Sequence, residues 1–298
     1  MTTATQGRRA RRRERRGADS QPFPSPSLVP GVPSASSAVP GQPRWMQRVF
    51  PGHDIDGPKV RLGFLWFLLL CGAVYAGLVA LGALYGLIAG IAALQMCREW
   101  KAVGRQPSRL VAGPIALAIV LSASVSLALP GLLALAATVL AVLLALFRRR
   151  RRTPLLDAAG TTVRCTVFHA LGAAAVLVTY RASIAGAIIL LVWVCAYEMG
   201  DFLVGSESGS ALLGPIAGMI AVGVFTFTVA VFQLSPFRDP VHAAVFGGLV
   251  AVLCPLSQLA ASLLLPTARA SAPALRRLDS LLLTAPVYVW LLWSYLAA

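Results

Sequence analysis

Charged side chains are scarce in this sequence of 298 residues, because Asp, Glu, Lys and Arg together make up only 12% of it. A soluble globular domain carries about 25%. Hydrophobic residues account for 57%, the mean hydropathy is +0.75, and the apolar residues come in long blocks. These features exclude an ordinary soluble domain and predict an all-α, polytopic integral membrane protein.

Paired cysteines and clustered histidines are also lacking. The five cysteines stand singly with no C-x-x-C pair, and the three histidines show no metal-ligand spacing. A free cysteine in an apolar segment behaves as a small hydrophobic residue. The sequence therefore predicts neither a disulfide framework nor a zinc site.

Acidic residues are few, since 11 Asp and Glu stand against 26 Lys and Arg, for a formal net charge of +15. Seven arginines crowd residues 8–16, and Arg148–Arg152 form an uninterrupted run. Beside membrane helices, such clusters mark the cytosolic side and contact anionic lipid headgroups. Nucleic acid is not predicted as a partner, because the clusters lack interleaved aromatic residues and a recognisable binding module.

The chain divides into a tail, residues 1–58, and a transmembrane domain, residues 59–298. The tail is basic and then rich in Pro and Ser, which predicts a disordered extension rather than a signal peptide. About nine transmembrane helices are predicted in the domain. Their ranges are 62–78, 80–97, 110–128, 130–147, 162–180, 183–204, 211–233, 241–265 and 279–297.

The basic residues of the connections lie on one side of the membrane. They gather in the tail and in residues 97–109, 147–152 and 268–277, each separated from the next by an even number of predicted helices. By the positive-inside rule, the protein lies in the cell membrane with its N-terminal tail in the cytosol and its C-terminus outside. The connection GSESGS falls on the cytosolic side with its neighbours.

Small residues recur at a spacing of four. Gly82, Gly86 and Gly90 form one such series, and Gly214 and Gly218 form another. In lipid this spacing lets helix backbones approach closely, so both series are predicted to pack against neighbouring helices. The sequence leaves a homodimer open.

Several polar residues lie within the apolar segments, where ionisable side chains usually face a cavity or a partner. Glu198 and Asp201 share one face of the sixth predicted helix. They could hold a divalent cation such as Mg²⁺. Alternatively, one or both reach the interface or are neutralised, for which Arg277 is the candidate. In the eighth segment, Pro255 followed by Ser257 and Gln258 predicts either a broken helix that lines a cavity or an ordinary packing kink, with the two polar residues satisfying freed carbonyl groups.

The segment ALRRLDSLLLTAPVYVWLLW spans residues 274–293 and carries three charges where the ninth helix begins. Asp279 is predicted to cap that helix and to complement its dipole. Arg276 and Arg277 suit the headgroup zone and could grip a phosphate. A cap and two topology arginines would explain all three residues without any chemistry.

This segment resembles the C-terminal signature of the phosphatidate cytidylyltransferases, or CDP-diacylglycerol synthases, in which an Asp-Arg-x-Asp-Ser sequence enters the last helix and Ala-Pro follows. The matching positions are Arg277, Leu278, Asp279, Ser280, Ala285 and Pro286. The stretch VCAYEMGDFLVG is similar to the family's Asp-x-Gly-x-Tyr-x-x-Gly motif, and ALQMCREW is similar to the end of its second helix. The resemblance covers roughly residues 62–298 and is most specific at its end.

The resemblance implies a cytosolic-facing polar cavity in which Mg²⁺ and CTP meet phosphatidate, giving CDP-diacylglycerol and pyrophosphate. It implies catalytic and metal-binding roles for Asp279 and Glu198. It implies substrate-binding roles for Arg276, Arg277, Gln258 and Asp201. Mg²⁺ and CTP would be needed only if the protein is active.

Several motif positions depart from the family pattern. Arg276 replaces the first signature aspartate, and Pro255 and Gln258 stand where the family has an aspartate and a glutamate. The histidine-glycine-glycine turn and the lysine-rich loop are missing, and each lost carboxylate removes an oxygen ligand for a cation. The sequence therefore predicts a degenerate member that binds a membrane lipid, phosphatidate or an anionic phospholipid, or a partner protein. The alternative is an active enzyme with a reduced metal site of Glu198, Asp201 and Asp279. A small-solute transporter is weaker, since no inverted repeat is found.

Overall fold

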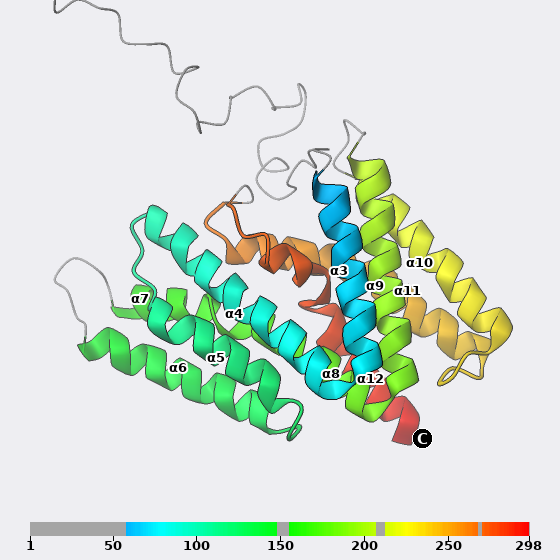
Figure 1. Cartoon of the computed structure of the whole chain (residues 1–298), viewed down its shortest axis with the longest axis horizontal. Coiled ribbons are helices and arrows are strands. Elements are labelled where there is room, and N and C mark those ends of the chain that lie inside the picture. Colours follow the sequence, from blue (N-terminus) through cyan, green and yellow to red (C-terminus); the bar gives the residue numbers. More distant parts are fainter. Residues whose placement is uncertain (1–57, 148–154, 207–211, 268–269, 298) are drawn as a thin grey trace, which may run out of the picture. The chain divides into compact units, whose positions relative to one another are not determined.

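The described part of the chain is helical throughout. The computed structural model describes residues 58–147, 155–206, 212–267 and 270–297, and every regular element in these ranges is a helix (Figure 1). All of these residues belong to one compact unit. The all-α prediction is thus confirmed for the described residues. The predictions for almost all of the tail, for the arginine run and for most of the GSESGS connection lie outside them.

Each of the nine predicted apolar segments contains a helix. The elements are α3 (Pro58–Ala76), α4 (Leu78–Ala102), α5 (Arg109–Ser122), α6 (Leu129–Phe147), α7 (Leu155–Arg164), α8 (Val167–Ala182), α9 (Ile184–Gly205), α10 (Leu213–Phe232), α11 (Pro240–Leu264), the 3-10 turns η2 (Leu275–Arg277) and η3 (Asp279–Leu281), and α12 (Thr284–Ala297).

Seven helical stretches in the described ranges are long and apolar enough to cross a membrane. They comprise α4, α6, α7 with α8, α9, α10, α11, and η3 with α12. The apolar part of α3 and the whole of α5 are shorter. The 14 residues of α5 rise about 21 Å at about 1.5 Å per residue, against a hydrocarbon core of about 30 Å. The seven apolar helices indicate a membrane-embedded protein.

The structure corrects two predicted boundaries. The fifth segment, predicted from residue 162, already begins in α7, because only a two-residue break separates α7 from α8. The third, predicted to reach residue 128, ends at Ser122. The ninth has its predicted bounds, Asp279–Ala297, although its first residues form the 3-10 turn η3 and its α-helix begins at Thr284.

Helix α8 is the scaffold of the domain. It packs against α4, α5, α9 and α12. Most of the apolar residues in the stretch of α7 and α8 are buried inside the domain, whereas most of those in α10 are not. A hydrogen bond of 3.0 Å joins His169 Nε2 of α8 to the carbonyl oxygen of Ala89 in α4. Most side chains of α10 are thus left to face lipid, while α8 holds the neighbouring helices together.

The small-residue faces pack as predicted. A Cβ atom built on Gly90 would lie 3.3 Å from the carbonyl oxygen of Gly113 in α5, and one on Gly82 would lie 3.1 Å from the side chain of Leu177 in α8. At Gly218 of α10, a Cβ would lie 2.7 Å from the backbone oxygen of Tyr197 in α9. These helix pairs therefore approach closely, and at Gly218 the approach leaves no room even for a Cβ atom unless the neighbouring backbone moves.

Helix α11 is not broken at Pro255, which lies inside one continuous helix. The interpretation of this proline as a break is therefore wrong. Ser257 and Gln258, expected to satisfy freed carbonyl groups of their own helix, instead bond to α9 and to the start of α12. Ser257 and Gln258 thereby join α11 to α9 and to the start of α12.

Close contact with α8 positions the segment between α11 and α12. A Cβ atom on Gly172 of α8 would lie 3.0 Å from the Cα atom of Leu282 and 3.2 Å from the carbonyl oxygen of Leu281. Only a residue without a side chain lets the chain after η3 lie this close to α8. The 3-10 turns that carry the predicted charged residues thereby rest on the most buried helix.

We expect Gly218→Ala to lower the unfolding temperature in detergent, because its Cβ would meet Tyr197 at a distance that real Cβ atoms do not show. Overpacking of this kind typically costs about 1–3 kcal/mol. The matched control is Gly223→Ala in the same helix, whose Cβ would meet nothing within 4 Å. Equal unfolding temperatures for the two variants would contradict the close contact of α9 and α10.

Candidate functional site

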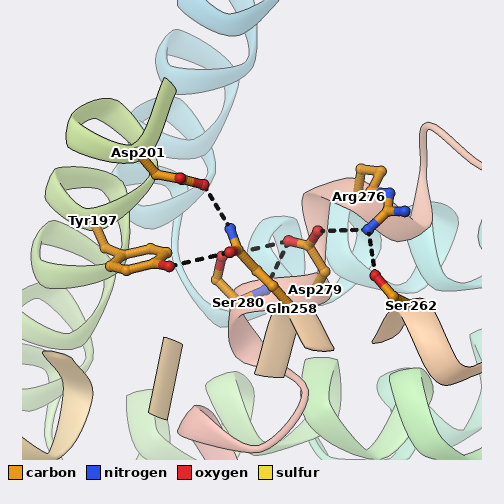
Figure 2. A network of polar contacts seen from close by, with 7 residues as sticks. All are labelled: Tyr197, Asp201, Gln258, Ser262, Arg276, Asp279 and Ser280. Atoms are coloured by element: carbon orange, nitrogen blue, oxygen red, sulfur yellow. Dashed lines mark hydrogen bonds and ion pairs between the residues drawn. The ribbon is translucent and has the colours of Figure 1, made fainter. Parts of the chain in front are cut away.

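A polar network links α9, α11 and the two 3-10 turns (Figure 2). Its seven residues are Tyr197 and Asp201 of α9, Gln258 and Ser262 of α11, and Arg276, Asp279 and Ser280 of the turns. They fall into a group around Gln258 and a group around Arg276. Both groups meet on α11, because Gln258 and Ser262 are one helical turn apart.

Gln258 bridges two residues of α9. Its Oε1 accepts a hydrogen bond of 3.1 Å from the hydroxyl of Tyr197, and its Nε2 donates one of 3.1 Å to Asp201 Oδ2. Tyr197 is fully buried and Asp201 is 4% exposed. An ionised carboxylate cannot donate a hydrogen bond, so Asp201 must face the amide nitrogen of Gln258 rather than its oxygen. The two partners therefore determine which way the side-chain amide of Gln258 points.

Arg276 is held by two side chains through one nitrogen. Its Nη1 lies 3.6 Å from Asp279 Oδ2 and donates a hydrogen bond of 3.2 Å to Ser262 Oγ. The other oxygen of Asp279, Oδ1, accepts from the amide nitrogen of Ser280 at 2.8 Å. Asp279 is buried, whereas the side chain of Arg276 is 25% exposed. A partly exposed cation therefore compensates a buried carboxylate.

The prediction that Asp279 caps the ninth helix is wrong. Asp279 lies in η3, five residues before α12, and its carboxylate accepts from its own neighbour Ser280. The free amides at the start of α12 are those of Leu283 and Thr284, and both donate to Ser257 Oγ of α11, at 3.0 and 3.2 Å. The cap comes from another helix because the 3-10 turn moves Asp279 away from these amides.

Glu198 lies beside the network. It is partly exposed and interacts electrostatically with Asp279, Arg277 and Asp201. Arg277 therefore supplies a compensating charge near Glu198. This agrees with the alternative in which Arg277 neutralises this carboxylate. Within the described ranges, no group of three or more His, Cys, Asp or Glu side chains is placed to hold a metal ion.

Four of the six predicted site residues are brought into direct contact in the network: Asp201, Gln258, Arg276 and Asp279. Sequence reasoning missed Tyr197 and Ser262 as members of this site. Each lies four residues from a predicted one, Tyr197 before Asp201 and Ser262 after Gln258. A search one helical turn on either side of each polar residue could have found them.

Comparison with known proteins gives no matching family model, no matching curated protein and no matching solved structure.

Replacing Ser257 by Ala should destabilise the protein, because the backbone amides of Leu283 and Thr284, at the start of α12, would lose their acceptor. Leaving buried donors unsatisfied costs about 1–3 kcal/mol. Thermal unfolding in detergent measures the effect. Ser294→Ala is the control, since Ser294 is exposed and bonds only within its own helix. If both variants unfold at the same temperature, Ser257 does not stabilise the start of α12.

Proposed function

We propose that this chain is a nine-helix membrane protein of the phosphatidate cytidylyltransferase type that binds a phosphate-bearing membrane lipid without turning over CTP. The lipid is phosphatidate or another anionic phospholipid, and Arg276 and Arg277 contact its phosphate. The ion pair between Arg276 and Asp279 is the observation that carries this proposal.

The ion pair supports the loss of turnover. By the resemblance, Arg276 stands where the family has a carboxylate, so its guanidinium brings positive charge to a place where a cation would be bound. A buried carboxylate needs such compensation, and Asp279 receives it from Arg276. Asp201 is already engaged by Gln258. These contacts support a site that does not hold Mg²⁺.

The same pair supports phosphate binding. A guanidinium whose position is set by a carboxylate and a hydroxyl loses little side-chain freedom when it binds an anion. Arg276 is held in this way by Asp279 and Ser262, and Arg277 stands next to it, partly exposed. Charge-assisted bonds from arginine to phosphate are among the stronger hydrogen bonds in proteins.

One observation favours the alternative of an active cytidylyltransferase. Glu198 is close enough to Asp279 and Asp201 for the three charges to interact. Under this alternative, Mg²⁺ and CTP are bound by a reduced set of carboxylates, and Asp279 is catalytic. The two functions differ in whether the purified protein turns over CTP.

Purified protein supplied with phosphatidate, Mg²⁺ and labelled CTP should form no CDP-diacylglycerol, either as wild type or as Asp279→Asn. The same wild-type protein should retain phosphatidate in preference to phosphatidylcholine when bound lipids are counted by native mass spectrometry. Loss of one phosphate-binding arginine in Arg277→Gln should weaken that preference, whereas Arg238→Gln, an exposed arginine in another connection, should not.

Two results would count against this function. Turnover by the wild type that vanishes in Asp279→Asn would establish an active enzyme with a catalytic Asp279. Equal retention of phosphatidate and phosphatidylcholine by the wild type would remove the lipid-binding role.

The nine proposed spans consist of the seven long apolar stretches together with α3 and α5, which are shorter. The positive-inside rule supports this arrangement, because the basic connections alternate correctly only when both helices span. With nine spans, the connection between α4 and α5 is cytosolic and the turn between α5 and α6 is external. The tail is then cytosolic.

The span of α5 can be tested with one cysteine at each of its ends, in a Cys71→Ser background. Val103→Cys and Val125→Cys both replace exposed residues, and a membrane-impermeant thiol reagent added to whole cells should label only Val125→Cys. Labelling of both positions, or of neither, would show that the two ends of α5 lie on the same side.

A further inference from the structure

Three cations from three helices lie outside the seven-residue polar network of Figure 2, which we call the Asp279 network. Lys101 lies in the last turn of α4, Arg109 is the first residue of α5, and Arg164 is the last residue of α7. The guanidinium carbon of Arg164 lies 5.1 Å from the ring centroid of Trp100. Lys101 and Arg109 both act electrostatically on the thiol of Cys97. We call Trp100, Lys101, Arg109 and Arg164 the basic cluster.

The basic cluster lacks anionic partners of its own among the residues that the structure describes. The nearby carboxylate of Asp157 pairs with Arg105 instead, whose hydrogen bond raises the pKa of that arginine. Glu99, on the same end of α4, forms no ion pair with a described residue. The Nε of Arg109 is buried without a hydrogen-bond partner in the described ranges. Like charges held together in this way need a counter-anion.

The surrounding backbone holds the basic cluster in place. The indole Nε1 of Trp100 donates a hydrogen bond of 2.9 Å to the carbonyl oxygen of Leu264, at the end of α11. The amide of Ser108, next to Arg109, donates one of 3.2 Å to Thr162 Oγ1 in α7. Binding an anion here therefore requires little reordering of the elements that carry the cations.

We propose that the basic cluster binds the phosphate group of an anionic membrane phospholipid, at a site separate from the Asp279 network. A lipid suits it better than a soluble phosphate, because an exposed apolar residue adjoins one of the cations. Leu110, next to Arg109, is 80% exposed. Trp100 is a residue type enriched at membrane interfaces. Cations beside an exposed leucine and an interfacial tryptophan match a phosphate headgroup and its acyl chains.

The test uses the full-length protein in detergent with added phosphatidylglycerol or phosphatidylcholine, with bound lipids counted by native mass spectrometry. Each cation near an anionic lipid contributes about a fivefold gain in affinity. Arg109→Gln combined with Arg164→Gln should therefore weaken retention of phosphatidylglycerol about 30-fold relative to wild type. Lys101→Gln changes an exposed side chain and should weaken retention about fivefold. This variant keeps the test valid if the double variant does not fold.

Two controls separate this site from others. Arg238→Gln should leave retention unchanged, because Arg238 lies in the connection before α11. Arg277→Gln should weaken only the binding of lipid at the Asp279 network and should keep the phosphatidylglycerol molecule that the basic cluster holds, so failure of the function proposed for that network can be distinguished from failure here. Retention equal to wild type in both Lys101→Gln and the folded double variant would overturn the proposal. Complete displacement by free glycerol phosphate would assign the cluster to a soluble phosphate instead.

Discussion

A carboxylate inside an apolar helix assembly must be compensated, and two buried carboxylates organise the C-terminal half of this domain. Asp201 is bound by Gln258 of α11, and Asp279 is approached by Arg276 from the preceding turn. Without these partners, each charge would carry a desolvation cost of several kcal/mol. The bond from Gln258 to Asp201 requires α11 to lie beside α9, and the bond from Arg276 to Ser262 requires α11 to lie beside the 3-10 turns. Polar pairing of these groups therefore specifies which helices meet here, as well as stabilising them.

Arginine side chains have two kinds of surroundings in this protein. Arg276 lies beside a buried carboxylate and a hydroxyl, which set the position of its guanidinium within a polar network. Arg109 and Arg164 have an exposed leucine or a tryptophan ring beside them and form no ion pair with a carboxylate among the described residues. The charge of Arg276 is therefore partly balanced inside the domain, whereas the described residues do not balance the charges of Arg109 and Arg164 in this way.

The helical segments were predictable because long apolar blocks leave few alternatives in lipid. Helix ends were less predictable, since Asp279 followed by apolar residues looks like the start of a helix although 3-10 turns come first. The sequence also identified Asp201, Gln258, Arg276 and Asp279 as site candidates, because polar residues stand out in apolar segments. Their partners were not predictable, because the contact of Gln258 with Tyr197 joins residues 61 positions apart. A single sequence carries no signal for such long-range pairs.

The cap on α12 has a consequence for the order in which the domain assembles. Ser257 belongs to α11, which precedes α12 in the chain, so its hydroxyl is already in the membrane when Leu283 and Thr284 are made. The first turn of α12 can complete its hydrogen bonds only by docking onto that earlier helix. During synthesis, the start of α12 can therefore be completed only after α11 is in place.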